Sequence, residues 1–133
     1  MKKRSLLMMA GLLLAFHSFA QASEDMLDRR SYAVQITEAN KPGNNTDTLS
    51  FNNGQFEAAS YAGRGYAKAD YKATVTNGVI TFSAVATNKE GGVANWSGVI
   101  QAKHIIGKLS LVEVDKEKKE NISTEFAFQG DGR

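Results

Sequence analysis

The sequence predicts an all-β fold in which eight antiparallel strands close into a single up-and-down barrel. From Tyr32 onward, apolar and polar residues alternate with a period of two, which is typical of strands with one buried face. Short turn signals separate these stretches, and little room is left for a helix longer than one or two turns. The strands are expected at residues 32–38, 47–51, 55–59, 66–76, 79–86, 93–101, 104–114 and 121–128.

The clearest unit is a hairpin centred on Asn77-Gly78. This dipeptide favours a type I′ turn, because both central residues must adopt positive φ. The turn fixes the register, so that Ala73 should face Phe82 and Tyr71 should face Ala84 on the inner side. Large residues opposite small ones are expected where an inner face interdigitates with its neighbours.

A second hairpin runs from 93 to 114 with a tight turn at Ala102-Lys103. Its register pairs Gly98 with Gly107 and Trp96 with Leu109. Glycine inside a strand marks a bend or a close approach. We therefore expect the glycine pair to let the sheet coil sharply and to leave room for a large ring. A gap shaped for a ligand is the alternative.

The connections indicate a barrel with two different ends. The tight turns at 52–54, 77–78 and 102–103 fall at one end of a meander, and the longer polar segments at 39–46, 60–65, 87–92 and 115–120 fall at the other. Closing the sheet would remove exposed strand edges. A two-sheet sandwich is the main alternative. The last strand should place Ile122, Thr124, Phe126 and Phe128 inward.

The N-terminal residues 1–22 are predicted to be a signal peptide. Lys2 to Arg4 are basic, residues 6–16 are apolar, and small residues at the expected spacing favour cleavage after Ala22, or alternatively after Ala20. A polar lead-in at 23–31 and a single barrel domain at 32–133 follow. The predicted location is the periplasm or the exterior, and the absence of cysteine means that the fold does not rely on disulfides.

Removing the signal peptide changes the charge balance. The remaining 13 Lys and Arg residues face 14 Asp and Glu residues, a formal charge of −1. Nucleic acid is therefore not an expected partner. The segment 6–16 is too short to span a bilayer comfortably, so no membrane-spanning segment is expected.

The predicted barrel resembles the calycin type, meaning lipocalin-like and avidin-like proteins. The open-ended meander, the compact length and the strand WSGVI (96–100) carry this resemblance, which covers residues 32–128. The chain is also similar to small exported bacterial proteins that repeat an x-W-x-G-x-I-x pattern. Its first strand, SYAVQITE, lacks the G-x-W of lipocalins, and the polar residues of an avidin biotin site are not found in matching order. The resemblance implies a barrel and binding at its mouth, without a particular ligand.

Residues for catalysis or metal binding are sparse. His104 is the single histidine after the signal peptide, and without cysteine it cannot build a typical zinc site. We read it as an exposed turn residue and expect no enzyme activity, no metal and no cofactor. Gly63-Arg64-Gly65 lacks the helix that a phosphate loop requires. It is interpreted as a flexible loop, although Arg64 is the residue best placed to meet an anionic group.

Two binding hypotheses follow from the open end. In the first, small inward residues leave space for a small, partly apolar ligand. In the second, Phe56, Phe126 and Phe128 fill the barrel, and the loops at 60–65 and 87–92 contact another periplasmic protein, as in an inhibitor or an envelope-associated partner. The small residues are Ala67, Ala69, Ala86 and Ala94, and the ligand contacts expected under the first hypothesis are Trp96, Tyr71, Tyr66, Arg64 and Tyr61.

Overall fold

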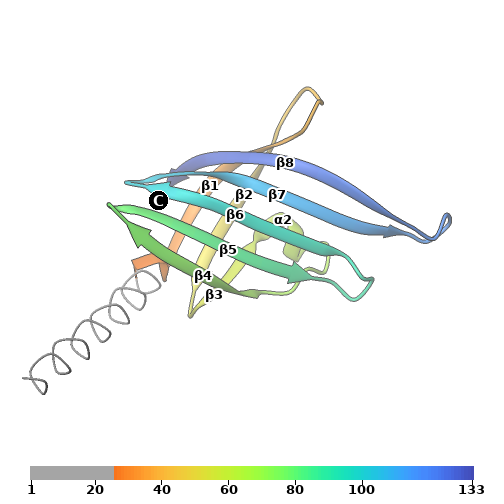
Figure 1. Cartoon of the computed structure of the whole chain (residues 1–133), viewed down its shortest axis with the longest axis horizontal. Coiled ribbons are helices and arrows are strands. Elements are labelled where there is room, and N and C mark those ends of the chain that lie inside the picture. Colours follow the sequence, from red (N-terminus) through yellow and green to blue (C-terminus); the bar gives the residue numbers. More distant parts are fainter. Residues whose placement is uncertain (1–25) are drawn as a thin grey trace, which may run out of the picture.

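The chain forms one closed barrel of eight antiparallel strands joined in sequence order (Figure 1). The computed structural model describes residues 26–133. The predicted signal peptide and the first residues of the lead-in lie outside that range. The elements are β1 (Arg30–Glu38), β2 (Asn45–Asn52), β3 (Gln55–Ala58), α2 (Ala59–Ala62), β4 (Ala69–Thr76), β5 (Val79–Thr87), β6 (Val93–Gln101), β7 (His104–Asp115) and β8 (Glu120–Gly132).

The meander closes because β1 pairs with β8 as well as with β2, so the barrel is confirmed and the sandwich is not formed. The predicted register is also confirmed. Asn77 and Gly78 both have positive φ, and Ala73 lies opposite Phe82. Residues 26–27 are helical and precede β1, and Leu27 is fully buried in the core.

The glycine pair leaves room for large rings, as its position predicts. Gly98 and Gly107 lie opposite each other on β6 and β7. A Cβ atom on Gly98 would lie 2.9 Å from the ring of Phe82, and one on Gly107 would lie 2.5 Å from the ring of Phe128. Two aromatic rings therefore pack directly onto glycine backbone. The rings that use this space are Phe82 and Phe128, which come from the neighbouring strands.

Aromatic side chains fill the barrel along its length. Trp96 contacts Phe56 with ring centroids 5.2 Å apart, and Phe56 contacts Phe51 at 5.3 Å. Phe51 then reaches Tyr32 at 6.0 Å and Tyr71 at 5.1 Å. Each of these rings is almost completely buried. Phe56 and Phe128, which the second hypothesis expected to fill the interior, are part of this packed core, whereas Phe126 is only partly buried.

Two strands differ by three or more residues from their predicted limits. β4 begins at Ala69 rather than at residue 66, because residues 59–68 form α2 and a connecting segment, and Ala67 is consequently exposed rather than inward. β8 runs from Glu120 to Gly132, and its start projects with the end of β7 beyond the barrel rim (Figure 1). The expectation that Ile122 points into the core is therefore wrong. Its side chain is 49% exposed, since no core reaches that far.

Candidate functional site at the open end of the barrel

The helical turn α2 covers the open end of the barrel. Tyr61 on α2 is buried, and its ring meets Trp96 edge-on with centroids 5.3 Å apart. Tyr66, in the segment that follows, packs edge-on against Tyr61 at 5.8 Å. The chain turns sharply between them, since the N–H of Tyr66 donates to the carbonyl of Tyr61 at 3.0 Å. Three of the predicted site residues thus lie together, because the ring of Tyr61 contacts those of Trp96 and Tyr66.

Arg64 and Glu113 fasten this cover to the end of β7. One guanidinium nitrogen of Arg64 lies 2.9 Å from each carboxylate oxygen of Glu113, and the guanidinium stacks 4.9 Å from the ring centroid of Tyr61. The hydroxyl of Tyr66 donates to the same carboxylate at 3.3 Å. Glu113 was missed from the sequence. The sequence does contain a clue to it, because Glu113 follows Leu109 and Leu111 at a spacing of two and so lies on the inward-facing side of β7.

The electrostatics of this cluster favour neutral tyrosines beside one ion pair. Burial raises the pKa of Tyr61 and of Tyr66 above the usual value for a tyrosine, and the Glu113 carboxylate raises that of Tyr66 further. Both hydroxyls therefore remain protonated at neutral pH. The cluster offers stacking surfaces and a guanidinium, but the Glu113 carboxylate already engages that guanidinium.

Tyr71 is not part of the open-end cluster, so the expectation that it lines the mouth is wrong. Its hydroxyl donates to Oδ1 of Asp28 at 2.7 Å, and the same oxygen accepts the backbone N–H of Gly54 at 3.0 Å. Gly54 belongs to the tight turn between β2 and β3, at the closed end of the barrel. The strands of a barrel are tilted, so residues paired across neighbouring strands do not lie at one level of the axis.

Tyr71→Phe should destabilise the protein modestly and in a pH-dependent way. The hydrogen bond from the N–H of Gly54, followed by that from the hydroxyl of Tyr71, lowers the pKa of Asp28 below its usual value. The stabilisation is therefore fully present above the ordinary carboxyl pKa and is lost as the pH falls through the lowered value. We expect the variant to lose about 1 kcal/mol at pH 7. Thermal unfolding should show the difference between the two proteins shrinking as the pH falls below the ordinary aspartate pKa of about 3.9. An equal difference at pH 7 and at acid pH would contradict this role of Asp28.

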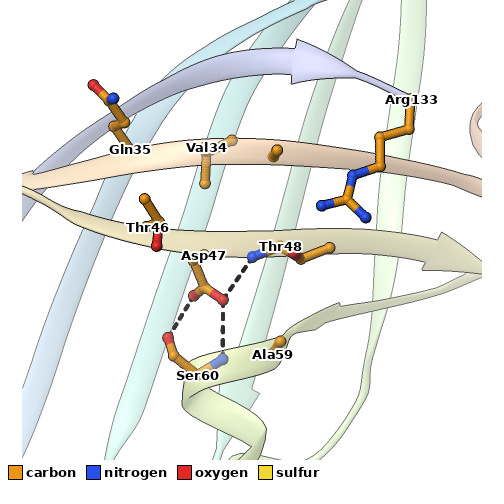
Figure 2. A pocket seen from close by; sticks show the side chains of 9 residues that line it. Val34, Gln35, Thr46, Asp47, Thr48, Ala59, Ser60 and Arg133 are labelled. Carbon is orange, nitrogen blue, oxygen red and sulfur yellow. Dashed lines mark hydrogen bonds between the residues drawn. The ribbon is translucent and has the colours of Figure 1, made fainter.

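A groove lies on the outer side of the barrel where α2 passes under β2 (Figure 2). Its volume is about 730 Å³, and it is open to solvent. At its floor, the buried carboxylate of Asp47 accepts the N–H of Thr48 at 2.8 Å, the N–H of Ser60 at 2.9 Å and the hydroxyl of Ser60 at 2.5 Å. The groove is lined by Ala33, Val34, Gln35, Thr46, Asp47, Thr48, Ala59, Ser60 and Arg133.

Asp47 ties α2 to the barrel at a place where the sheet lacks a strand. β3 pairs with β2 only from Leu49 to Asn52, so residues 45–48 of β2 have no strand on that side. The Asp47 carboxylate accepts the backbone N–H of Thr48, which would otherwise have bonded to a longer β3. The sequence placed Asp47 at the start of a strand but did not identify this role. Asp47 thus fastens α2 to β2, and Glu113 fastens the segment after α2 to the end of β7.

The other candidates from the sequence have ordinary surroundings. His104 is exposed beside the β6–β7 turn, with Nδ1 3.2 Å from a carboxylate oxygen of Asp131. Among residues 26–133, no three His, Cys, Asp or Glu side chains lie close enough together to hold a metal ion. No helix in that part of the chain is both long and apolar enough to cross a membrane.

No known protein family matches the chain, and no curated protein or solved structure is detectably similar to it. The resemblance to calycin-type barrels therefore stays a prediction. The interpretation of the site depends on its own geometry.

Proposed function

We propose that the chain is an exported, non-enzymatic interaction module that binds another protein through the rim at the open end of its barrel. The observation that carries this proposal is the continuous aromatic packing from Tyr61 to Tyr32. A small molecule entering the mouth would have to displace buried ring contacts. A protein binding the rim would have to displace only water and exposed charged side chains.

The rim has the composition of a recognition surface. The side chains of Arg64 and Glu113 are both almost half exposed. A second exposed ion pair joins Glu90, in the loop at 88–92, to Lys116, with 3.5 Å between the charged atoms. Charges of both signs arranged around a surface give orientation and specificity to protein association. Arginine beside aromatic rings, as at Arg64 and Tyr61, is enriched among residues that contribute most to such interfaces.

Export and the absence of catalysis are supported by the sequence. The basic and apolar segments within residues 1–22 fit a cleaved signal peptide, with the periplasm as the expected destination. A chain with no cysteine and with His104 as its single histidine after cleavage offers few groups for acid–base or nucleophilic chemistry. A periplasmic inhibitor and an envelope-associated partner protein are both consistent with this chemistry.

Affinity capture from a periplasmic extract tests the proposal when it is combined with two matched variants. Glu90→Lys reverses a charge on the rim. Asp70→Lys makes the same change on the exposed outer face of β4. We expect one protein to be captured in a stoichiometric amount by the wild-type chain and by Asp70→Lys, and to be lost with Glu90→Lys. Equal capture by all three chains, or capture by none, would overturn the proposal.

A small ligand beneath α2 is the second candidate, because the cover over Trp96 is slight. α2 has four residues, and its N-cap residue, Ala58, makes no side-chain cap hydrogen bond. The cover is held by side-chain contacts at Asp47 and Glu113 rather than by a strand. If it opened, Trp96 would form an apolar wall and Arg64 could meet an anionic group.

Native mass spectrometry of the protein purified gently from its own periplasm separates the two candidates. The interaction module predicts the mass of the bare polypeptide. An added mass of a few hundred daltons would instead support the small ligand. Trp96 is the only tryptophan in the chain, so titration with a fluorescent fatty acid provides a second readout. Saturable quenching of Trp96 would likewise support the small ligand, and no change would favour the packed barrel.

A further inference from the structure

A hollow with a volume of about 400 Å³ lies at the closed end of the barrel, opposite the rim. Three segments that are far apart in the sequence line it: the start of β1, the tight turn between β6 and β7, and the end of β8 with the residue after it. Figure 1 shows the end of β8 beside that turn. Each segment contributes one basic side chain, and these are Arg30, Lys103 and Arg133.

Backbone hydrogen bonds hold the three segments together. The N–H of Gly132 donates to the carbonyl of Lys103 at 2.7 Å, and the N–H of Arg133 donates to the carbonyl of Ser31 at 3.1 Å. Gly132 lies opposite Tyr32, and a Cβ atom at Gly132 would lie 3.1 Å from the buried ring of Tyr32. Because glycine has no side chain there, the hollow stays open above this backbone and ring. The three segments are thus held in place before any ligand binds.

The basic side chains that line the hollow have no acidic partner. All three residues are exposed, and within residues 26–133 no carboxylate lies within ion-pair distance of them. The two aspartates at this end are engaged elsewhere. A carboxylate oxygen of Asp131 lies 3.2 Å from Nδ1 of His104, and the Asp28 carboxylate already accepts two hydrogen bonds. Like charges around a hollow without a counter-charge give it a positive potential, which favours an anion.

The three basic residues do not have equal positions. Arg133 also borders the groove at Asp47, because it lines both depressions. Figure 2 shows its side chain extended over β1. Arg30 and Lys103 therefore define the hollow itself, and Arg133 adds a third positive charge at its edge.

We propose that this hollow binds the phosphate monoester group of an anionic ligand. Such a group carries about two negative charges at neutral pH, whereas a carboxylate would leave two of the three basic side chains without a counter-charge. The planar guanidinium of Arg30 matches two phosphate oxygens, and the ammonium of Lys103 adds a compact charge. The hollow lies at the end of the barrel away from the rim, so this site goes beyond the proposed function and does not depend on it.

Titration with inorganic phosphate tests the site directly. The amide signals of the isotope-labelled protein are followed by NMR while sodium phosphate replaces sodium chloride at constant pH and ionic strength. We expect saturable shifts of the backbone amides of Lys103, Gly132 and Arg133, and no shift of the amide of Lys72 on the outer face of β4. Shifts that do not saturate, or equal shifts with chloride alone, would overturn the proposal.

Two double variants separate the site from an effect of net charge. Arg30→Gln with Lys103→Gln removes two positive charges from the hollow. Lys72→Gln with Lys108→Gln removes two exposed positive charges from the outer faces of β4 and β7. The first pair should weaken phosphate binding at least about tenfold, because charge-assisted hydrogen bonds are lost, and the second pair by less than about twofold. An equal loss in both would overturn the site, and thermal unfolding verifies that each variant is folded.

Vesicles distinguish a lipid from a soluble source of the phosphate group. Phosphatidic acid presents a phosphate monoester, so vesicles of phosphatidylcholine are prepared with and without it. Co-flotation only with phosphatidic acid, lost in the hollow variant and kept in the outer-face variant, would assign the site to a membrane lipid. Saturable binding of inorganic phosphate without co-flotation would assign it to a soluble phosphate monoester. Failure of both would overturn the proposal and would leave the capture experiment on the rim unaffected.

Discussion

Gly107→Ala should destabilise the barrel by about 3 kcal/mol, which is a large fraction of the stability of a small domain. The new Cβ atom would overlap the backbone carbonyl of Ser97 and would lie 2.5 Å from the ring of Phe128. The carbonyl belongs to the neighbouring strand and the ring is fixed by Trp96 and Phe82, so neither can move without disturbing the core. Thermal unfolding should show a midpoint lowered by more than about 10 °C.

Gly63→Ala provides the matched control for this prediction. Gly63 has φ of −64°, which any residue adopts, and a Cβ atom there would meet the carbonyl of Ser60 at an ordinary 3.5 Å. The same substitution should therefore be neutral or stabilise the protein by up to about 1 kcal/mol, because the unfolded chain becomes less flexible. If Gly107→Ala and Gly63→Ala unfolded at the same temperature, the close packing of Phe128 on β7 would be contradicted.

The register of the barrel could be predicted because it is set by local signals. Asn77-Gly78 and Asn53-Gly54 each place two residues at positive φ, and alternation of apolar residues then determines which face is buried. These signals act within a few residues, so each hairpin could be derived independently. The closure of β1 onto β8 followed from the number of strands and from the benefit of removing edges.

The contacts at the open end could not be predicted in the same way. Arg64 and Glu113 are 49 residues apart, and their ion pair depends on how residues 59–68 turn over the mouth rather than on strand periodicity. Asp47 and Ser60 meet because β3 is short, and strand length is poorly determined by sequence patterns. Tyr71 was misplaced because the alternation of residues along a strand predicts which face of the sheet a side chain lies on. It does not predict how far along the axis of a tilted barrel that side chain lies.

The packed core and the fastened cover both bear on the proposed function. Rings in mutual contact from Tyr61 to Tyr32 leave little room for a ligand in the interior, which supports the proposal that recognition takes place at the outer surface. The same arrangement gives the rim a rigid base, so that binding a partner there costs little ordering of the chain. Rigidity of the rim should therefore depend on Trp96, the ring on which α2 rests.

Trp96→Ala should destabilise the protein by about 3–5 kcal/mol, the cost of deleting a large buried aromatic side chain. Trp96 is 2% exposed and contacts rings of Tyr61, Phe56 and Phe128, so its removal leaves a cavity between the cover and the core. Val99→Ala, on the outer face of the same strand, is the control and should change stability by less than about 0.5 kcal/mol. Urea unfolding of both variants measures the difference.

Indole should partly restore the stability of Trp96→Ala, because a cavity enclosed by apolar rings binds a molecule of the deleted shape. The wild-type barrel should gain nothing from indole, since Trp96 already occupies the space. If indole stabilised the wild-type chain as much as the variant, the mouth would contain room beside Trp96, and the small-ligand candidate would replace the interaction module. If Trp96→Ala lost no stability, the contact of Tyr61 with Trp96 would not be what closes the barrel, and the rim would lack the rigid base that binding another protein requires.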